Sequence, residues 1–122
     1  MATVLIVEDQ PQILALAQSL LEEEGYKTLS APTADGALAV LAGAEAVDIL
    51  LVDIILSGDM QAGIELAKHA VEMNPGLKVI YSTALTLTDR TKELLLPGSA
   101  ILEKPYTLDQ LLTSLLEPRV RN

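Results

Sequence analysis

The stretch Ile49-Leu50-Leu51-Val52-Asp53 decides the fold. Four aliphatic residues that end in one carboxylate are typical of a strand buried on both faces, which is the environment of a central strand in a parallel sheet. Ligands of open α/β folds bind at the carboxyl ends of such strands. Asp53 therefore reaches a candidate site from a rigid part of the chain, and it is the first candidate functional residue.

The composition limits the classes of function. The 122 residues fit one domain with its own core, expected over residues 1–118, with a short tail at residues 119–122. A formal net charge of −9 disfavours direct binding to nucleic acid or to an anionic membrane. The chain has no cysteine, which excludes disulfides and thiolate metal sites. It also shows no signal peptide and no apolar run of spanning length, so a cytoplasmic protein is expected.

Predicted strands and helices alternate along the chain. The four other strands are expected over residues 3–7, 27–31, 77–81 and 100–102. Helices are expected from Pro11 to about Glu24, from a Thr33 cap to about Leu41, and over residues 63–73 and 88–96. A last helix is expected from a Thr107–Gln110 capping box to Pro118. Alternation of this kind predicts a parallel sheet with helices on both faces. The polar strand at 27–31 fits an edge, which gives a doubly wound α/β fold of flavodoxin-like (βα)5 type with strand order 2-1-3-4-5.

Polar residues follow the four neighbouring strands of this sheet. Glu8 and Asp9 follow the first strand, Asp53 ends the third, and Thr83 and Lys104 follow the fourth and fifth. Two carboxylates about 4 Å apart repel by roughly 4 kcal/mol at an effective dielectric near 20, so a cation would stabilise the cluster. An all-oxygen ligand set suits Mg²⁺ better than zinc or copper. With Lys104 and Thr83 beside it, Asp53 is predicted to be a nucleophile that carries an acyl phosphate.

Each of these residues alone has a simpler structural interpretation. An aspartate at the end of a strand often caps a helix or forms a turn. Glu8 and Asp9 can simply precede a helix that begins at Pro11, and a single threonine or lysine after a strand is usually a loop residue. The prediction therefore depends on their joint occurrence at the ends of neighbouring strands.

The chain resembles, over essentially its whole length, the receiver domains of two-component response regulators, the CheY-like family. The resemblance rests on Val7-Glu8-Asp9, Asp53, Thr83-Ala84 and Lys104-Pro105. It implies that Asp53 accepts a phosphoryl group from a histidine kinase, a phosphotransfer protein or a small phosphodonor. It implies Mg²⁺ bound by Asp9, Asp53 and the Ile55 carbonyl, with Glu8 acting through water. It further implies that Thr83, the Ala84 backbone and Lys104 contact the phosphoryl group, and that Lys104-Pro105 is a cis peptide bond.

The sequence departs from this family at three places. Ser57 stands where many receivers have proline, and the loop before Gly63 is about two residues longer than the commonest pattern. Ile101 occupies the switch position that is generally Tyr or Phe. Tyr106 is a candidate substitute, with packing as its alternative role.

Other residues give narrower expectations. Ile55 and Leu85 are apolar at positions that flank the path of the hydrolytic water in this family, so slow self-dephosphorylation is predicted. Ala84 is small and should leave the site open to a phosphodonor. His69 is expected on a solvated helix face. The run Leu94-Leu95-Leu96, together with the last helix, is a candidate surface for a partner or a homodimer.

The predicted function is that of a phosphoacceptor that signals through protein contacts and is not itself an enzyme. With no output domain after Asn122, a stand-alone receiver is expected, and an excised receiver of a larger regulator or hybrid kinase is the alternative. A phosphorylation-independent interaction module is a second hypothesis, which the complete set of acids, threonine and lysine disfavours. A small Mg²⁺-dependent phosphatase with an aspartyl intermediate is a third. Ile55, where such an enzyme would carry a second aspartate, disfavours it.

Overall fold

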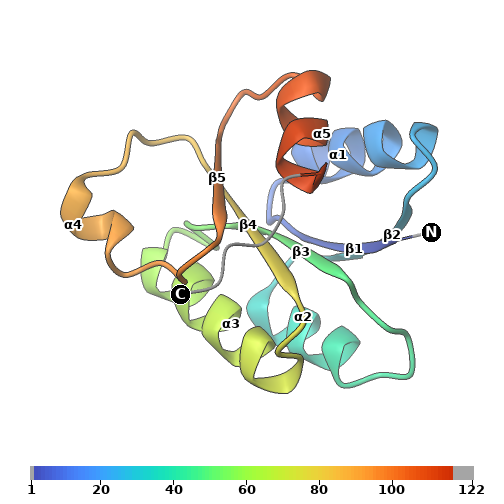
Figure 1. The fold of residues 1–122 in the computed structure, drawn as a ribbon, viewed down its shortest axis with the longest axis horizontal. Coiled ribbons are helices and arrows are strands. Elements are labelled where there is room, and N and C mark those ends of the chain that lie inside the picture. The colour runs from blue at the N-terminus through green and yellow to red at the C-terminus, as the bar shows by residue number, and fades with distance from the viewer. Residues whose placement is uncertain (1, 117–122) are drawn as a thin grey trace.

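The computed structural model describes residues 2–116, in which five strands and five helices alternate (Figure 1). The strands are β1 (Thr3–Val7), β2 (Lys27–Ala31), β3 (Ile49–Asp53), β4 (Lys78–Thr83) and β5 (Ala100–Glu103). The helices are α1 (Pro11–Glu23), α2 (Ala34–Leu41), α3 (Met60–Met73), α4 (Asp89–Lys92) and α5 (Leu108–Leu116). The predicted domain end at Pro118 and the predicted tail lie outside the described residues.

All strands are parallel, and the sheet has the order β2-β1-β3-β4-β5. The flavodoxin-like order predicted from the sequence is therefore confirmed. The more polar strand β2 lies at one edge, where Lys27 and Ser30 are exposed and only Ala31 is buried. The aliphatic strands β1 and β3 lie beside each other in the centre and are buried along their whole length.

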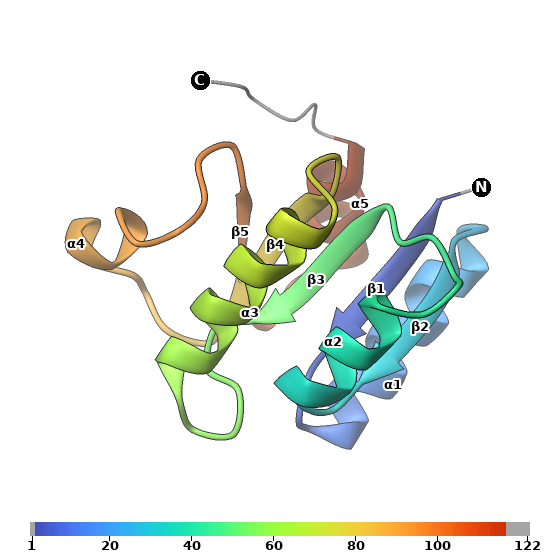
Figure 2. The same cartoon turned by 90° about the horizontal axis from the view of Figure 1, so that it is seen from below.

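Helices cover both faces of the sheet, with α1 and α5 on one side and α2 and α3 on the other (Figures 1 and 2). Consecutive residues of a strand point to opposite faces, so β3 contributes to two separate cores. Leu50 and Val52 belong to the cluster on the α2–α3 side, whereas Ile49 and Leu51 belong to the cluster on the α1–α5 side. The apolar residues 49–52 thus contribute to the core on both faces of the sheet. Within residues 2–116, no helix combines the length and apolar character that crossing a membrane requires.

Local signals fix several helix starts as predicted. The Thr33 hydroxyl accepts the N–H of Gly36 at 3.0 Å, which caps α2. Thr107 and Gln110 form the reciprocal capping box at the start of α5, with bonds of 2.8 and 3.1 Å. Side-chain oxygens satisfy amide groups that a helix start would otherwise leave unpaired.

Three boundaries differ from the prediction by more than one residue. Helix α3 begins at Met60 rather than Gly63, because the Asp59 carboxylate accepts the N–H of Gln61 at 2.9 Å and caps the helix earlier. Strand β4 runs on to Thr83 rather than ending at residue 81. Helix α4 stops at Lys92, whereas a helix over residues 88–96 was expected.

The early end of α4 has a local cause. After Lys92 the N–H groups of Leu94 and Leu95 bond to carbonyls three residues back, which tightens the chain into turns. The N–H of Leu96 then bonds to the buried hydroxyl of Tyr81 at 3.2 Å instead of continuing a helix. Leu95 is buried while Leu94 is exposed, so the leucine run is divided between the core and the surface.

Candidate functional site

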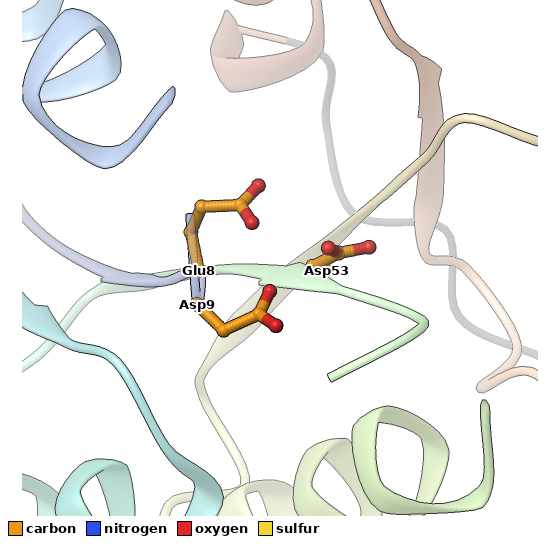
Figure 3. Close-up of side chains that lie close together, drawn as sticks. All are labelled: Glu8, Asp9 and Asp53. Carbon is orange, nitrogen blue, oxygen red and sulfur yellow. The ribbon is translucent and has the colours of Figure 1, made fainter. Parts of the chain in front are cut away.

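Three carboxylates meet at the carboxyl ends of the two central strands (Figure 3). Glu8 and Asp9 directly follow β1, and Asp53 is the last residue of β3. Each contributes one oxygen, and these oxygens all lie within 4.8 Å of one another. Glu8 and Asp53 are buried and Asp9 is half-buried, so the cluster opens to solvent on the Asp9 side. The convergence predicted from the sequence is therefore present.

Lys104 brings a positive charge to this cluster from the end of β5. Its Nζ lies 2.9 Å from Glu8 Oε1 and 3.1 Å from Asp53 Oδ2. Burial lowers the pKa of Lys104, but hydrogen bonds and charge attraction from Glu8 and Asp53 outweigh it, and the pKa is raised overall. The predicted cis peptide bond between Lys104 and Pro105 is also present.

Glu8 is the carboxylate most affected by its surroundings. Burial raises the pKa of Glu8, and the hydrogen bond from Lys104 lowers it. The negative charge of Asp53 raises it further, so the pKa of Glu8 is raised overall. One ammonium thus faces three carboxylates. The cluster retains excess negative charge that an additional cation would neutralise.

The loop after β3 supplies backbone donors to the acids. The N–H of Ile55 donates to Asp53 Oδ1 at 3.2 Å, and the N–H of Ser57 donates to Asp9 Oδ2 at 3.2 Å. Ser57 and Gly58 both have positive φ angles, 53° and 76°, so this loop turns sharply before α3. The first bond fixes the carboxylate of Asp53 relative to its own strand end.

Thr83 lies at the end of β4, next to the strand that carries Asp53, and its side chain is buried. Its hydroxyl accepts the N–H of Leu85 at 3.0 Å and donates to the carbonyl of the same residue at 3.3 Å. Ala84 and Leu85 are exposed. The structure therefore brings Thr83 to the correct edge of the sheet, with its hydroxyl bonded to the following loop.

The donor set suits a hard divalent cation. Carboxylate oxygens are the ligands that Mg²⁺ takes in proteins, usually with several waters that complete an octahedron. Asp9 is accessible enough for such waters, while Glu8 and Asp53 provide charge from a buried position. Glu8, Asp9 and Asp53 are thus able to hold Mg²⁺. The Ile55 carbonyl, expected as a further ligand, stays a prediction.

One contributor to the site was not predicted, and a second has the packing role that was given as its alternative. The Ser57 amide contacts Asp9, and the dipeptide Ser57-Gly58, which favours tight turns, is the sequence signal that could have indicated it. Tyr106 packs against the hydrophobic core on the α1–α5 side of the sheet, as its alternative role requires. Burial first and the charge of Glu8 second raise the pKa of Tyr106. No local pattern in the sequence indicates this electrostatic effect of Glu8 on Tyr106.

The usual switch position has a different arrangement. Ile101 is 38 % exposed on β5 and pairs in register with Tyr81 on β4. Tyr81 is fully buried, and its hydroxyl accepts the N–H of Leu96. Burial raises the pKa of Tyr81, and the bond from Leu96 partly opposes that change. An aromatic side chain thus contacts the turns that follow α4, from β4 rather than β5. His69 is exposed, as expected.

Known proteins share this sequence pattern and fold. The model of the response regulator receiver domain matches residues 4–116. The heme response regulator HssR of Staphylococcus saprophyticus is 34 % identical over 113 residues, covering 92 % of this chain and 49 % of HssR. The nitrogen assimilation regulatory protein NtrX of Azorhizobium caulinodans is 33 % identical over 109 residues, covering 88 % of this chain and 24 % of NtrX. The chain thus spans half or less of the length of these relatives.

Solved structures agree with the sequence relatives. A CheY-like response regulator receiver domain protein from Methanospirillum hungatei superposes with a TM-score of 0.84 at 33 % identity, covering 94 % of this chain and 90 % of that one. The response regulator TrrA of Thermotoga maritima, solved in complex with Mg²⁺ and BeF, gives 0.78 at 26 % identity, covering 94 % and 96 %. Fold, acidic cluster and family match point the same way, and the chain belongs to the response regulator receiver domain family.

Proposed function

We propose that Asp53 is the phosphoacceptor of this receiver domain and takes its phosphoryl group from a histidine kinase or a phosphotransfer protein. The observation that carries the proposal is the meeting of Asp53 with Glu8, Asp9 and Lys104 at adjacent strand ends. Asp53 comes from a fully buried strand, so its carboxylate is held in one place. A positioned nucleophile among compensating charges is most of what phosphoryl transfer requires of a protein.

In the proposed reaction, a carboxylate oxygen of Asp53 attacks the phosphorus of a phosphohistidine. The new O–P bond forms an acyl phosphate, the P–N bond breaks, and the imidazole leaves with its electron pair and takes up a proton. Lys104 already contacts Asp53 and would follow the charge onto the phosphoryl oxygens. Thr83 and the backbone of the exposed Ala84 would donate to the other oxygens. Bound Mg²⁺ would supply charge neutralisation between the carboxylates and the phosphoryl group.

Glu8, Asp9 and Asp53, with the Ile55 carbonyl, form the proposed Mg²⁺ site. Support comes from the short spacing of their oxygens and from the hard, anionic donor set. Receiver domains of this family are phosphoacceptors rather than enzymes in the ordinary sense. The chemistry expected of this chain is accordingly its own phosphorylation and dephosphorylation.

The proposed output is contact with another protein. The net charge of −9 disfavours direct binding to nucleic acid or to an anionic membrane. Exposed apolar side chains lie just after α4, on β5 and on α5, where Leu94 is 51 %, Ile101 38 % and Leu116 76 % exposed. This face is the proposed surface for a downstream protein or a homodimer. Sedimentation velocity with and without beryllofluoride tests the dimer. The cytoplasmic location stays a prediction.

Intact mass spectrometry after incubation with acetyl phosphate tests the proposed function. Wild-type protein should gain one phosphoryl group with Mg²⁺ and none in the presence of a chelator. Asp53→Ala should gain none, whereas Asp35→Asn, on the exposed side of α2, should behave as wild type. If the wild type gains no mass, beryllofluoride is added as a phosphoryl mimic. Failure of both reagents would favour the phosphorylation-independent interaction module.

A further inference from the structure

The loop between β3 and α3 contains a defined two-residue turn. Leu56 and Asp59 exchange both backbone hydrogen bonds, with N–H to oxygen pairs at 3.2 and 2.9 Å. Between them, Ser57 and Gly58 have φ angles of 53° and 76°. Positive φ at both central residues is the mark of a type I′ turn. The direction in which the Ser57 amide points is therefore set by the turn.

That amide points at one of the acids. The N–H of Ser57 donates to Asp9 Oδ2 at 3.2 Å, between residues 48 positions apart in the chain. A carboxylate has two oxygens and about four lone-pair sites, so Asp9 accepts this bond and still has an oxygen to offer to a cation. Asp9 is the least buried of the three acids, and the bond lies at the open rim of the cluster.

The three acids are held in different ways. Glu8 and Asp53 each bind Lys104, which fixes their carboxylates from the β5 side. Asp9 is held by the Ser57 amide. Hydrogen bonds to a ligating carboxylate orient it and tune its affinity for the metal. We propose that the backbone N–H of Ser57 is a positioning group that presents Asp9 to Mg²⁺, supported by the Ser57-Gly58 turn. The inference rests on the Mg²⁺ site proposed above.

The same turn connects Asp9 to a helix. Asp59 closes the turn through its backbone and caps α3 through its side chain, which accepts the N–H of Gln61 at 2.9 Å. The group that orients Asp9 is thus built on the rigid start of α3. Because the donor is a backbone amide, the serine side chain is not required, whereas the N–H and the positive φ are.

Substitutions at positions 57 and 58 separate these requirements. Ser57→Pro removes the N–H and cannot adopt a φ of 53°. Ser57→Gly keeps both the N–H and the positive φ and is the matched control. Gly58→Ala strains only the turn, since an added Cβ would meet nothing within 4 Å, and it replaces Ser57→Pro if that variant does not fold. Folding is checked by circular dichroism and thermal unfolding.

The measurements are Mg²⁺ affinity by calorimetry, without any phosphodonor, and the ¹H–¹⁵N resonance of the residue-57 amide during Mg²⁺ titration. Ser57→Pro should bind Mg²⁺ roughly tenfold more weakly, the lower end of losses for partners of metal ligands. Gly58→Ala should weaken binding less, and Ser57→Gly should stay within about twofold of wild type. In the wild type, the Ser57 amide should move with the same midpoint as the calorimetric signal.

Equal Mg²⁺ affinity in wild type and a folded Ser57→Pro would overturn this inference and leave the phosphoacceptor proposal standing. An equal loss in Ser57→Gly would also overturn it, because a general disturbance of the loop would then explain both. If the wild type binds no Mg²⁺, the proposed metal site fails together with the positioning role.

Discussion

The hydroxyl of Thr83 and the backbone of Leu85 are bonded to each other, with the N–H of Leu85 3.0 Å from Oγ1 and the carbonyl oxygen 3.3 Å from it. A threonine hydroxyl has a single hydrogen. To donate to a phosphoryl oxygen on Asp53, Thr83 must therefore release the Leu85 carbonyl. The loop that leads into α4 is the part of the chain that would register this exchange.

The Leu85 amide resonance should accordingly report occupation of the site. With Mg²⁺ and beryllofluoride, it should shift in the wild type and in Thr83→Ser, which keeps the hydroxyl. In Thr83→Ala the shift should fall to less than about half, because the side chain has no hydrogen bond to exchange. A ¹⁹F spectrum confirms that fluoride is bound in each variant. A full Leu85 shift in Thr83→Ala would show that another group drives the loop.

Removal of the Lys104 charge should destabilise the domain. Lys104→Met leaves the buried Glu8 and Asp53 without their cation, and loss of one partner of a buried pair costs about 3–5 kcal/mol. Urea unfolding in a chelator measures this cost. Lys27→Met is the control, because its pair with Glu45 is half-exposed and should contribute about 0–1 kcal/mol.

Mg²⁺ should then stabilise Lys104→Met more than it stabilises the wild type, since Mg²⁺ replaces the missing positive charge. Unfolding free energies with and without MgCl₂ give the difference for each protein. An equal Mg²⁺ effect in both would mean that the cation does not compensate the same carboxylates as Lys104.

Gly63→Ala should damage the site through the backbone. A Cβ at Gly63 would lie 2.5 Å from the carbonyl oxygen of Asp53 and even closer to that of Ile54, so α3 must move away from the end of β3. Overpacking of this kind costs about 1–3 kcal/mol, and Asp53 phosphorylation should slow as well. Gly76→Ala is the control, with an ordinary contact at 3.5 Å. Matching stabilities for the two variants would contradict the close approach.

Ile55→Asn should accelerate loss of the phosphoryl group. Ile55 is half-buried and Leu85 is 48 % exposed, and neither side chain can hold a hydrolytic water by a hydrogen bond. An amide at position 55 could orient that water, and an acceleration on the order of tenfold corresponds to about 1.4 kcal/mol of barrier. Decay is followed by intact mass after removal of the donor. Leu94→Asn, which changes an exposed leucine just after α4, controls for polarity alone.

Stability should fall as the pH rises above about 10, the ordinary pKa of tyrosine. The folded state raises the pKa of Tyr81 and of Tyr106, chiefly by burial, so it holds their protons more tightly than the unfolded chain does. The stabilisation is complete below the unfolded pKa and is lost as the pH passes through the folded values. Urea unfolding between pH 9 and pH 11 measures the slope.

Tyr81→Phe and Tyr106→Phe should each flatten this dependence, and Tyr26→Phe is the matched substitution for comparison. The pKa of Lys104 is also raised, so its contribution to the stability of the domain also falls as the pH rises. This contribution will leave a residual slope of stability against pH. An unchanged slope in both buried variants would contradict the burial argument.

The sequence was informative where local pattern and burial coincide. The aliphatic run ending at Asp53 predicted a central strand, and the polar segment at 27–31 predicted an edge strand. Both predictions were possible because the polarity of a strand's residues reflects how deeply the strand is buried in the sheet. Alternation of strands and helices then predicted Glu8, Asp9 and Lys104 at one edge of the sheet, where they lie.

Contacts that depend on the direction of the backbone could not be predicted from the sequence. The Ser57 amide reaches Asp9 only because two residues have positive φ, and α4 ends early because Leu96 bonds to a tyrosine fifteen residues back. Periodicity reports which face of an element is apolar, and it does not report where a loop amide points.

The Lys104–Glu8 bond joins residues 96 positions apart, which follow the first and the last strand of the sheet. During synthesis, Glu8 and Asp53 leave the ribosome long before the lysine that compensates their charge. A nascent chain that ends before β5 thus has two acids at the end of a sheet without their ammonium partner. The site is completed only when the chain has been translated past β5, so products that end before Lys104 would lack a working phosphoacceptor centre even where the earlier strands had already paired.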